Sequence, residues 1–432
     1  MEKRPSFRHV ILIASIALAV RAVFLPLVLH IPLAGDERYY WRISCPDKMG
    51  IEYYAIVTQA PLWGMVLWWL RSSSSLLQTP IAARALSALI GALTPLLVYL
   101  LATGVFDRRT GLIAGILYSL FPEHIGFSHY LWAEILLSFL AVLAACLFFK
   151  FVESPRSARW LYWSAIAGGF ALITKEYTLL LFVGFLGTFP AVRHYLSVKK
   201  LIIACCLFIL PATLYSVAIS CAFQRIVFIS KGIEHTMAYS EGLVSLGKAD
   251  NNEFRLRTIW RSIHRRPVNK TVRFFDEQVC NLWTPNSYPI VRLIHAPGYP
   301  RGFRDFTYGR TTWASFVLAW MTALSSIAVI TVGLTGLCLG DSGPFRNFSF
   351  IALGGITLSG FIVWEMSRYR LPFMFILIIW AAYVLTHLRG VVTALSHRGR
   401  VALLCVLLLL YAHVVSSRVH TLGYISAPNR IT

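Results

Sequence analysis

Long apolar segments recur along this chain from one end to the other. A helix needs about 20 consecutive apolar residues to cross the hydrocarbon core of a bilayer, and runs such as 81–104 and 312–338 reach that length. Of the 432 residues, 57% are hydrophobic and 14% are charged. A soluble protein of this size is less apolar. The sequence therefore predicts an all-α membrane protein that crosses the bilayer many times.

Hydropathy predicts about eleven membrane-spanning helices. The expected spans are 10–30, 81–104, 110–122, 131–152, 160–174, 176–192, 200–221, 312–338, 347–365, 371–388 and 401–417. The first run is too long for the apolar part of a cleaved signal peptide, so we expect it to remain as a span. The two runs that flank Lys175 are short, and half-length helices that meet inside the protein are the alternative there.

Three parts follow from this pattern. We expect an N-terminal transmembrane module over 1–221, whose first external loop (31–80) holds the candidate catalytic site. An extracytoplasmic loop with amphipathic helices is expected over 222–311, because apolar residues recur there at helical spacing. Residues 312–432 are expected to form the C-terminal transmembrane helices.

Basic residues mark alternate connections between the expected spans. They are Lys3, Arg4, Arg8, Arg108, Arg109, Arg156, Arg159, Arg193, Lys199, Lys200, Arg389, Arg398 and Arg400. By the positive-inside rule these connections are cytoplasmic. The N-terminus is then inside the cell, and an odd number of spans places the C-terminus outside. The segments 31–80, 121–134, 222–311 and 364–372 then lie on the extracytoplasmic face.

The formal net charge of +21 does not indicate a nucleic-acid partner. The cations are scattered through loops between apolar helices, so anionic headgroups or a phosphate-bearing lipid are better partners. None of the eight cysteines forms a CxxC pair. Cys45 and Cys280 lie in expected polar loops, and a disulfide between them is the less favoured alternative.

Two adjacent carboxylates, Asp36 and Glu37, follow the first expected span. They are either solvated acids at a helix end or one wall of a functional site, and the pair alone does not decide between the two. Arg21 favours a site, because a cation in the middle of a span is costly unless it faces a polar interior. The segment 53–70 also favours a site, since its aromatic residues and Pro61 predict an interfacial helix that returns to the membrane.

The turn 121–134 carries two histidines and two acids. They are Glu123, His124, His129 and Glu134. Their spacing matches no metal-binding pattern, and the two histidines do not share a helix face. We therefore predict no cofactor, with a divalent metal as the weaker alternative. Glu134 begins a span, and a carboxylate at that depth is typical of a functional site.

Two further charged clusters lie at the ends of expected spans. Lys175 either pairs with its neighbour Glu176 to cap two helices or faces the site, and the two alternatives are equally favoured. Arg368 and Arg370, on either side of Tyr369, either snorkel to the membrane surface or bind a phosphate. Guanidinium groups suit phosphate because they offer two parallel donors to its oxygens.

In their order along the chain, these features resemble the GT-C class of membrane glycosyltransferases. "GDERYYWRIS", after a helix with a mid-span arginine, is similar to the first external loop of the protein O-mannosyltransferases and the lipid A aminoarabinose transferases (GT39/GT83-like). Residues 83–134 resemble their second to fourth helices, and "ITKEYTLLL" and "SRYRLPF" resemble later landmarks. Two departures stand out. Some relatives carry Lys or His where Gln59 and Ala60 precede the proline, and Arg38 is placed differently from the arginine of the aminoarabinose enzymes.

The resemblance implies a GT-C fold and an enzyme of the inner or plasma membrane. Such an enzyme moves a hexosyl or pentosyl group from a polyprenyl-phosphate donor to a hydroxyl of a glycan, lipid or protein, on the extracytoplasmic face and with inversion. The implied catalytic residues are Asp36 as general base, with Glu37 and Glu134 orienting the acceptor or stabilising the oxocarbenium-like centre.

The resemblance also implies how the substrates are held. The implied donor phosphate-binding residues are Arg368, Arg370, Lys175 and Arg38. The implied substrate-binding residues are Tyr40, Arg84, His129 and Tyr369.

Two other classes of protein remain as alternatives. A secondary transporter or flippase for a lipid-linked or anionic solute would place ionisable groups near the bilayer midplane and would show two related halves. No such halves are apparent in the sequence. A non-catalytic membrane scaffold would not need the acid pair Asp36 and Glu37.

Overall fold

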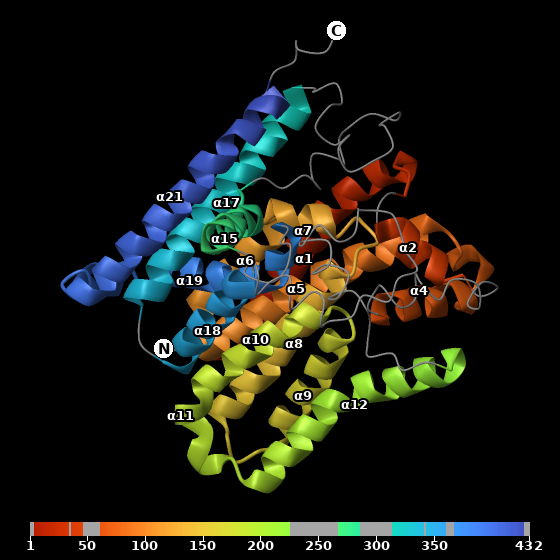
Figure 1. Cartoon of the computed structure of the whole chain (residues 1–432), viewed down its shortest axis with the longest axis horizontal. Coiled ribbons are helices and arrows are strands. Elements are labelled where there is room, and N and C mark those ends of the chain that lie inside the picture. Colours follow the sequence, from red (N-terminus) through yellow and green to blue (C-terminus); the bar gives the residue numbers. More distant parts are fainter. Residues whose placement is uncertain are drawn as a thin grey trace.

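The computed structural model of the protein describes residues 4–33, 36–45, 61–224, 267–285, 313–340, 343–359 and 367–426. These residues form a bundle of helices and include no strand (Figure 1). Within these described residues, seven helices are long and apolar enough to cross a membrane. They are Phe7–Val28, Pro80–Val105, Glu134–Glu153, Val198–Cys221, Trp320–Leu339, Ser367–Thr386 and Arg398–Ser417. The all-α polytopic fold class is confirmed, whereas the number of crossings stays a prediction.

The helices follow one another along the chain in two groups. The first group is α1 (Phe7–Phe24), η1 (Leu25–His30), α2 (Asp36–Ile43), α4 (Leu62–Ser73), η3 (Ser75–Leu77), α5 (Pro80–Val105), α6 (Arg108–Leu120), α7 (Pro122–Phe127), α8 (Glu134–Glu153), α9 (Arg159–Leu172), η4 (Glu176–Thr178), α10 (Leu179–Gly184), η5 (Phe185–Thr188), α11 (Phe189–Val192), η6 (Arg193–Tyr195) and α12 (Val198–Phe223). The second group is α15 (Val268–Trp283), α17 (Trp313–Leu339), α18 (Pro344–Ser359), η8 (Ser367–Phe373), α19 (Met374–Thr386), α20 (Leu388–Ala394) and α21 (Arg398–Ser426).

Local sequence signals define the hairpin of α5 and α6. Thr79 caps α5 by accepting a hydrogen bond from the Ala82 amide at 3.2 Å, and Pro80 occupies the first turn, where its missing N–H is not needed. Asp107 caps α6 by accepting from the amides of Arg109 and Thr110. These caps fix where each helix begins, and they leave only a short connection between the two.

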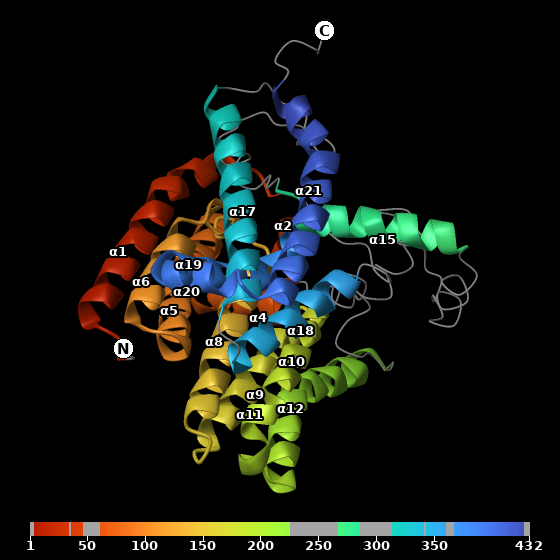
Figure 2. The ribbon, with the colours of Figure 1, turned by 90° about the vertical axis from the view of Figure 1, so that its left-hand side faces the viewer.

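The core of the bundle lies around α8 and α19. α8 packs between α5 and α9, and α19 packs against α17 and α6 (Figures 1 and 2). The span Ser367–Thr386 is 83% buried, whereas Val198–Cys221 is 11% buried. Because α12 exposes an almost entirely apolar surface, we assign that surface to lipid.

The region of the expected span 176–192 forms short pieces rather than one helix. η4, α10, η5 and α11 follow each other there and pack on α18. Gly187 lies so close to the Asn347 backbone that a Cβ atom would contact it at 2.8 Å. This close approach needs a residue without a side chain. The neighbouring α9 has only 14 residues, so both runs beside Lys175 are shorter than a full span.

Parts of both expected external loops lie in the described residues. α4 begins directly after Pro61, and α15 is a helix within the expected loop 222–311. The departures at Gln59 and Ala60 lie outside the described residues. No disulfide joins Cys45 and Cys280, which both lie in the described residues.

Candidate functional site

A carboxylate and a guanidinium from distant parts of the chain meet at one end of the bundle. Asp36 is the first residue of α2, and Arg368 lies in η8. The Arg368 Nη1 atom donates to Asp36 Oδ2 at 2.6 Å, and the Nε atom lies 3.5 Å from Glu134 Oε1. The side chains of Asp36, Arg368 and Glu134 are 19%, 12% and 1% exposed. We call these three residues, with Lys175 and Tyr40, the carboxylate cluster.

Lys175 and Tyr40 complete the carboxylate cluster. The Lys175 Nζ atom lies 6.0 Å from the centre of the Tyr40 ring, and Tyr40 is fully buried. Burial lowers the pKa of Lys175, but the neighbouring Tyr40, Glu134 and Asp36 outweigh it and raise the pKa above its ordinary value. Lys175 is therefore protonated at neutral pH, so the cluster holds two cations.

Asp36 is ionised in this environment. Burial raises its pKa, but the charges of Arg368 and Lys175 and the hydrogen bond from Arg368 outweigh burial, so the pKa lies below its ordinary value. At neutral pH the side chain is a carboxylate that can accept a proton.

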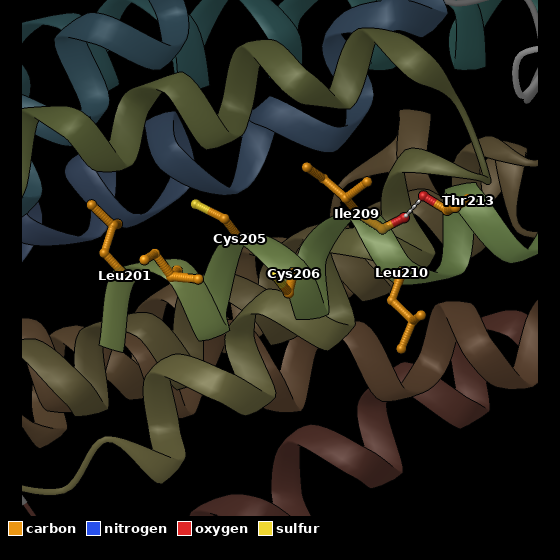
Figure 3. A pocket seen from close by; sticks show the side chains of 7 residues that line it. Leu201, Cys205, Cys206, Ile209, Leu210 and Thr213 are labelled. Carbon is orange, nitrogen blue, oxygen red and sulfur yellow. Dashed lines mark hydrogen bonds between the residues drawn. The ribbon is translucent and has the colours of Figure 1, made fainter. Parts of the chain in front are cut away.

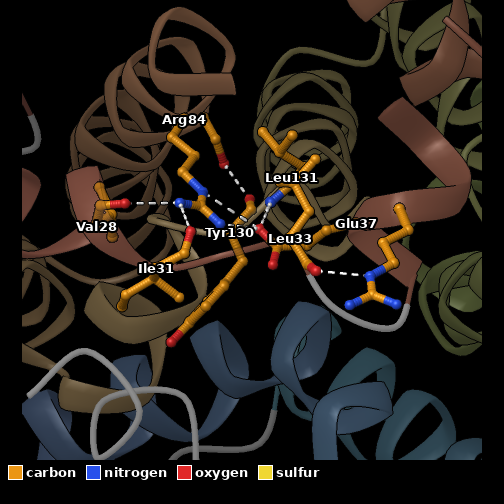
Figure 4. A network of polar contacts seen from close by, with 9 residues as sticks. Val28, Ile31, Leu33, Glu37, Arg84, Tyr130 and Leu131 are labelled. Carbon is orange, nitrogen blue, oxygen red and sulfur yellow. Dashed lines mark hydrogen bonds and ion pairs between the residues drawn. The ribbon is translucent and has the colours of Figure 1, made fainter. Parts of the chain in front are cut away.

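The adjacent Glu37 faces a different partner. Successive residues of an α-helix point about 100° apart, and Glu37 contacts Arg84 of α5. Arg84 Nη2 donates to Glu37 Oε1 at 3.0 Å, and both side chains are buried. Arg84 Nη1 donates to the carbonyls of Val28 and Ile31, at 2.7 and 2.8 Å (Figure 4). This network ties η1, the start of α2 and α5 together.

The same Glu37 carboxylate reaches the turn before α8. The amide of Leu131 donates to Glu37 Oε1 at 3.2 Å (Figure 4). The contact fixes the backbone three residues before Glu134. Glu37 and Arg84 therefore hold in place the segments that carry Asp36 and Glu134.

Arg370 is fully buried and bound by protein groups. Its Nη2 atom donates to Glu123 Oε2 at 3.0 Å. Its Nη1 atom donates to the carbonyls of Leu282, at 3.0 Å, and Thr284, at the end of α15. Arg370 thus connects η8 to the turn at α7 and to the end of α15, and it does not contact the carboxylate cluster.

The two histidines of the turn 121–134 bind protein groups that are not carboxylates. His124 Nδ1 lies 2.8 Å from Arg21 Nη2. The ring nitrogens of His129 lie 2.8 Å from the Ile125 carbonyl and 2.9 Å from the Arg21 carbonyl. Both rings are buried and join the turn to α1, while Glu123 and Glu134 contact different arginines. These four residues do not converge on one metal site.

Three further residues that the sequence singled out are not part of the carboxylate cluster. Arg21 is 2% exposed and faces the interior of the bundle, as expected from its position in the span. Arg38 is exposed, and its Nε atom donates to the Leu33 carbonyl at 2.7 Å. The Tyr369 ring lies 5.1 Å from the Tyr177 ring.

The sequence did not predict the ion pair of Arg370 with Glu123, since the two residues are 247 positions apart in the chain.

An apolar hollow of about 470 Å³ lies along α12 (Figure 3). It is lined by Leu201, Ile202, Cys205, Cys206, Ile209, Leu210 and Thr213. No residue of the carboxylate cluster lines this hollow, and its wall belongs to the lipid-facing helix. We therefore do not assign it to the site.

Comparison with known proteins places the chain by sequence and by fold. Residues 61–218 match the family model described as dolichyl-phosphate-mannose-protein mannosyltransferase. No curated protein matches the sequence. The chain resembles the apo oligosaccharyltransferase of Archaeoglobus fulgidus with a TM-score of 0.53 and 14% identity, over 97% of this chain and 56% of that one. This likeness shows the fold, and the chain spans about half the length of that protein.

Two further solved structures are similar at lower scores. The protein O-mannosyltransferase Pmt1-Pmt2 complex of S. cerevisiae, bound to its sugar donor, has a TM-score of 0.42 and 19% identity, over 57% of this chain and 38% of that one. ArnT of Cupriavidus metallidurans, bound to undecaprenyl phosphate, has a TM-score of 0.43 and 14% identity, over 87% of this chain and 77% of that one. The apolar spans and the fold of the archaeal enzyme show that the chain is an integral membrane protein with the GT-C fold, and residues 61–218 are similar to the protein mannosyltransferase family.

Proposed function

We propose that this protein is a glycosyltransferase that moves a hexosyl or pentosyl group from a polyprenyl-phosphate donor to an acceptor hydroxyl, with inversion. The observation that carries the proposal is the carboxylate cluster, in which the ionised Asp36 lies beside the cations Arg368 and Lys175. The family description supports the donor class, because it names a dolichyl-phosphate-linked sugar.

The position of the cluster suits a lipid-linked donor. Glu134 is the first residue of the span Glu134–Glu153, and Arg368 is the second residue of Ser367–Thr386. Asp36 follows the span Phe7–Val28. A donor whose isoprenoid tail lies among these apolar helices can present its phosphate to the cluster at the ends of the spans. The basic connections lie at the opposite ends, which favours an extracytoplasmic site.

The chemistry needs a base and a stabilised leaving group. The acceptor oxygen attacks the anomeric carbon, and its proton passes to the Asp36 carboxylate. The bond from the anomeric carbon to the phosphate oxygen breaks, and the polyprenyl phosphate leaves with the electron pair. Arg368 and Lys175 stabilise the negative charge of that phosphate. Glu134 holds the Arg368 guanidinium and lies where it can orient the acceptor.

Donor binding would also activate the base. In the structure, Arg368 pairs with Asp36. A phosphate that draws Arg368 away removes a cation from Asp36, which raises the pKa of its carboxyl group and makes it a stronger base. Arg370, Glu37 and Arg84 position these groups, since each is buried and bound to protein atoms.

Reconstitution with polyprenyl-phosphate sugars tests the proposal. The wild-type protein in proteoliposomes is given a set of labelled hexosyl and pentosyl donors and cell-envelope acceptors. We expect labelled product with inverted anomeric configuration and one free polyprenyl phosphate per sugar transferred. Accumulation of unchanged donor or solute inside the vesicles, without product, would instead identify a flippase or transporter.

A further inference from the structure

A second group of chemically reactive side chains lies where α15 meets α21. Asp276 and Cys280 are four residues apart on α15, so they share one helix face. His413 and Ser417 have the same spacing on α21. His413 Nε2 lies 2.9 Å from Asp276 Oδ1, and Ser417 Oγ donates to Cys280 Sγ at 3.3 Å.

These residues bring three kinds of metal-binding atom to one point. A carboxylate oxygen of Asp276, the thiol of Cys280 and an imidazole nitrogen of His413 lie within 4.8 Å of one another. Around a tetrahedral zinc ion, bonds of about 2.0–2.3 Å place ligand atoms roughly 3.3–3.8 Å apart. Small side-chain rotations would therefore gather all three atoms around one ion.

We propose that Asp276, Cys280 and His413 form a binding site for Zn²⁺ or a divalent cation of similar softness. Thiolate and imidazole ligands select such ions over Mg²⁺ and Ca²⁺, which prefer oxygen ligands. Three protein ligands leave the fourth position of a tetrahedral ion to water.

The surroundings of the site suit metal entry and retention. The side chains of Asp276 and His413 are each 55% exposed, so an ion can reach the site from solvent. Cys280 is 2% exposed and forms the inner wall. The hydroxyl of Ser417 supports the sulfur in the way that outer-shell hydrogen bonds orient metal ligands.

A bound ion would join the external loop to the last described helix. Only six residues after Asp276, the Leu282 carbonyl accepts a hydrogen bond from Arg370 of η8. An ion that fixes α15 against α21 would therefore also fix the end of α15 that binds Arg370. The site itself is separate from the carboxylate cluster and does not depend on the proposed sugar transfer.

Metal titration of the untagged, full-length protein tests this site. After treatment with a chelator, the protein is titrated with Zn²⁺, and with Co²⁺ to detect thiolate ligation by its charge-transfer absorption. We expect one tight Zn²⁺ site per chain and a cobalt-thiolate band. Loss of an outer-shell partner costs about 10–100-fold in metal affinity, so Ser417→Ala should weaken Zn²⁺ about tenfold and His413→Ala by more than about 100-fold.

Matched variants separate this site from other histidines and cysteines. His397→Ala and Cys405→Ser, both exposed positions outside the site, should bind Zn²⁺ like the wild type. Cys280→Ser should lose the cobalt-thiolate band. His413→Ala changes an exposed residue, so it keeps the test decisive if Cys280→Ser does not fold. The proposal is overturned if the wild type shows no such band, or if His413→Ala binds Zn²⁺ as tightly as His397→Ala.

Discussion

Arg368 and Asp36, 332 positions apart in the chain, form an ion pair of 2.6 Å at one end of the helical bundle. The pair joins α2 to η8, the segment that precedes α19. Glu134 lies on the other side of the same guanidinium. Arg368 therefore lies between two carboxylates, and the proposed donor phosphate would compete with them for it.

Replacing Arg368 should weaken donor binding. Hydrogen bonds to charged groups contribute about 1.5–3 kcal/mol, so Arg368→Gln should raise the Kd for polyprenyl phosphate by roughly 10–100-fold. Equilibrium binding of a labelled polyprenyl phosphate to protein in nanodiscs measures this change. Arg156→Gln, at an exposed position beyond the end of α8 that is opposite to Glu134, is the matched control and should change the Kd little. An unchanged Kd in Arg368→Gln would exclude the phosphate contact.

The pH dependence of transfer should report the carboxyl group of Asp36. Its pKa lies below the ordinary value of about 3.9. The base is active when ionised, so kcat/KM should stay level as the pH falls from 7 to about 5 and should decline only at still lower pH.

The same profile should move when Arg368 is replaced. Arg368→Gln removes a cation beside Asp36. The decline of kcat/KM at low pH should then begin at a higher pH, because burial raises the pKa of Asp36 and one cation fewer opposes this effect. If the decline of kcat/KM begins at the same pH in Arg368→Gln as in the wild type, a group other than Asp36 causes it.

The buried pair of Glu37 and Arg84 should matter more for stability than for chemistry. Removing one partner of a buried ion pair leaves an uncompensated charge and costs about 3–5 kcal/mol. Glu37→Gln should therefore lower the Tm in detergent more than Asp36→Asn does. The double variant Glu37→Leu with Arg84→Met should recover part of the loss, since no buried charge is left alone. A Tm of Glu37→Gln equal to that of the wild type would contradict this role.

The side of the membrane on which the cluster lies can be tested by labelling. In a cysteine-free background, Arg38→Cys and Arg109→Cys introduce thiols at exposed positions of α2 and α6. A membrane-impermeant maleimide should label position 38 in intact cells and position 109 only after permeabilisation. The reverse pattern would place Asp36 on the cytoplasmic side.

The sequence predicted the fold class for clear physical reasons, and it singled out several residues that the structure brings together in the carboxylate cluster. Apolar runs of span length have few structural alternatives in a bilayer. A charged residue at a span end needs a polar environment. This rule predicted a polar site around Asp36, Glu134, Lys175 and Arg368. These signals depend only on composition and position along the chain.

The partners of each charge could not be predicted in this way. Glu37 and Asp36 are neighbours with identical chemistry, yet one meets Arg84 and the other Arg368, because the turn of α2 points them apart. Arg370 matched the pattern for phosphate binding as well as Arg368 did. Its burial against Glu123 depends on packing between α7, α15 and η8, which no local pattern encodes.

The most direct measurement is the single-turnover rate of sugar transfer in Asp36→Asn at saturating donor. General base catalysis contributes about 10²–10⁴-fold, so the rate should fall by that factor. The donor Kd should not rise, because Asp36 competes with the donor phosphate for Arg368. Glu153→Gln, at an exposed acid on the last turn of α8, should transfer sugar at the wild-type rate. A single-turnover rate for Asp36→Asn within a few-fold of the wild type would contradict the assignment of Asp36 as the base.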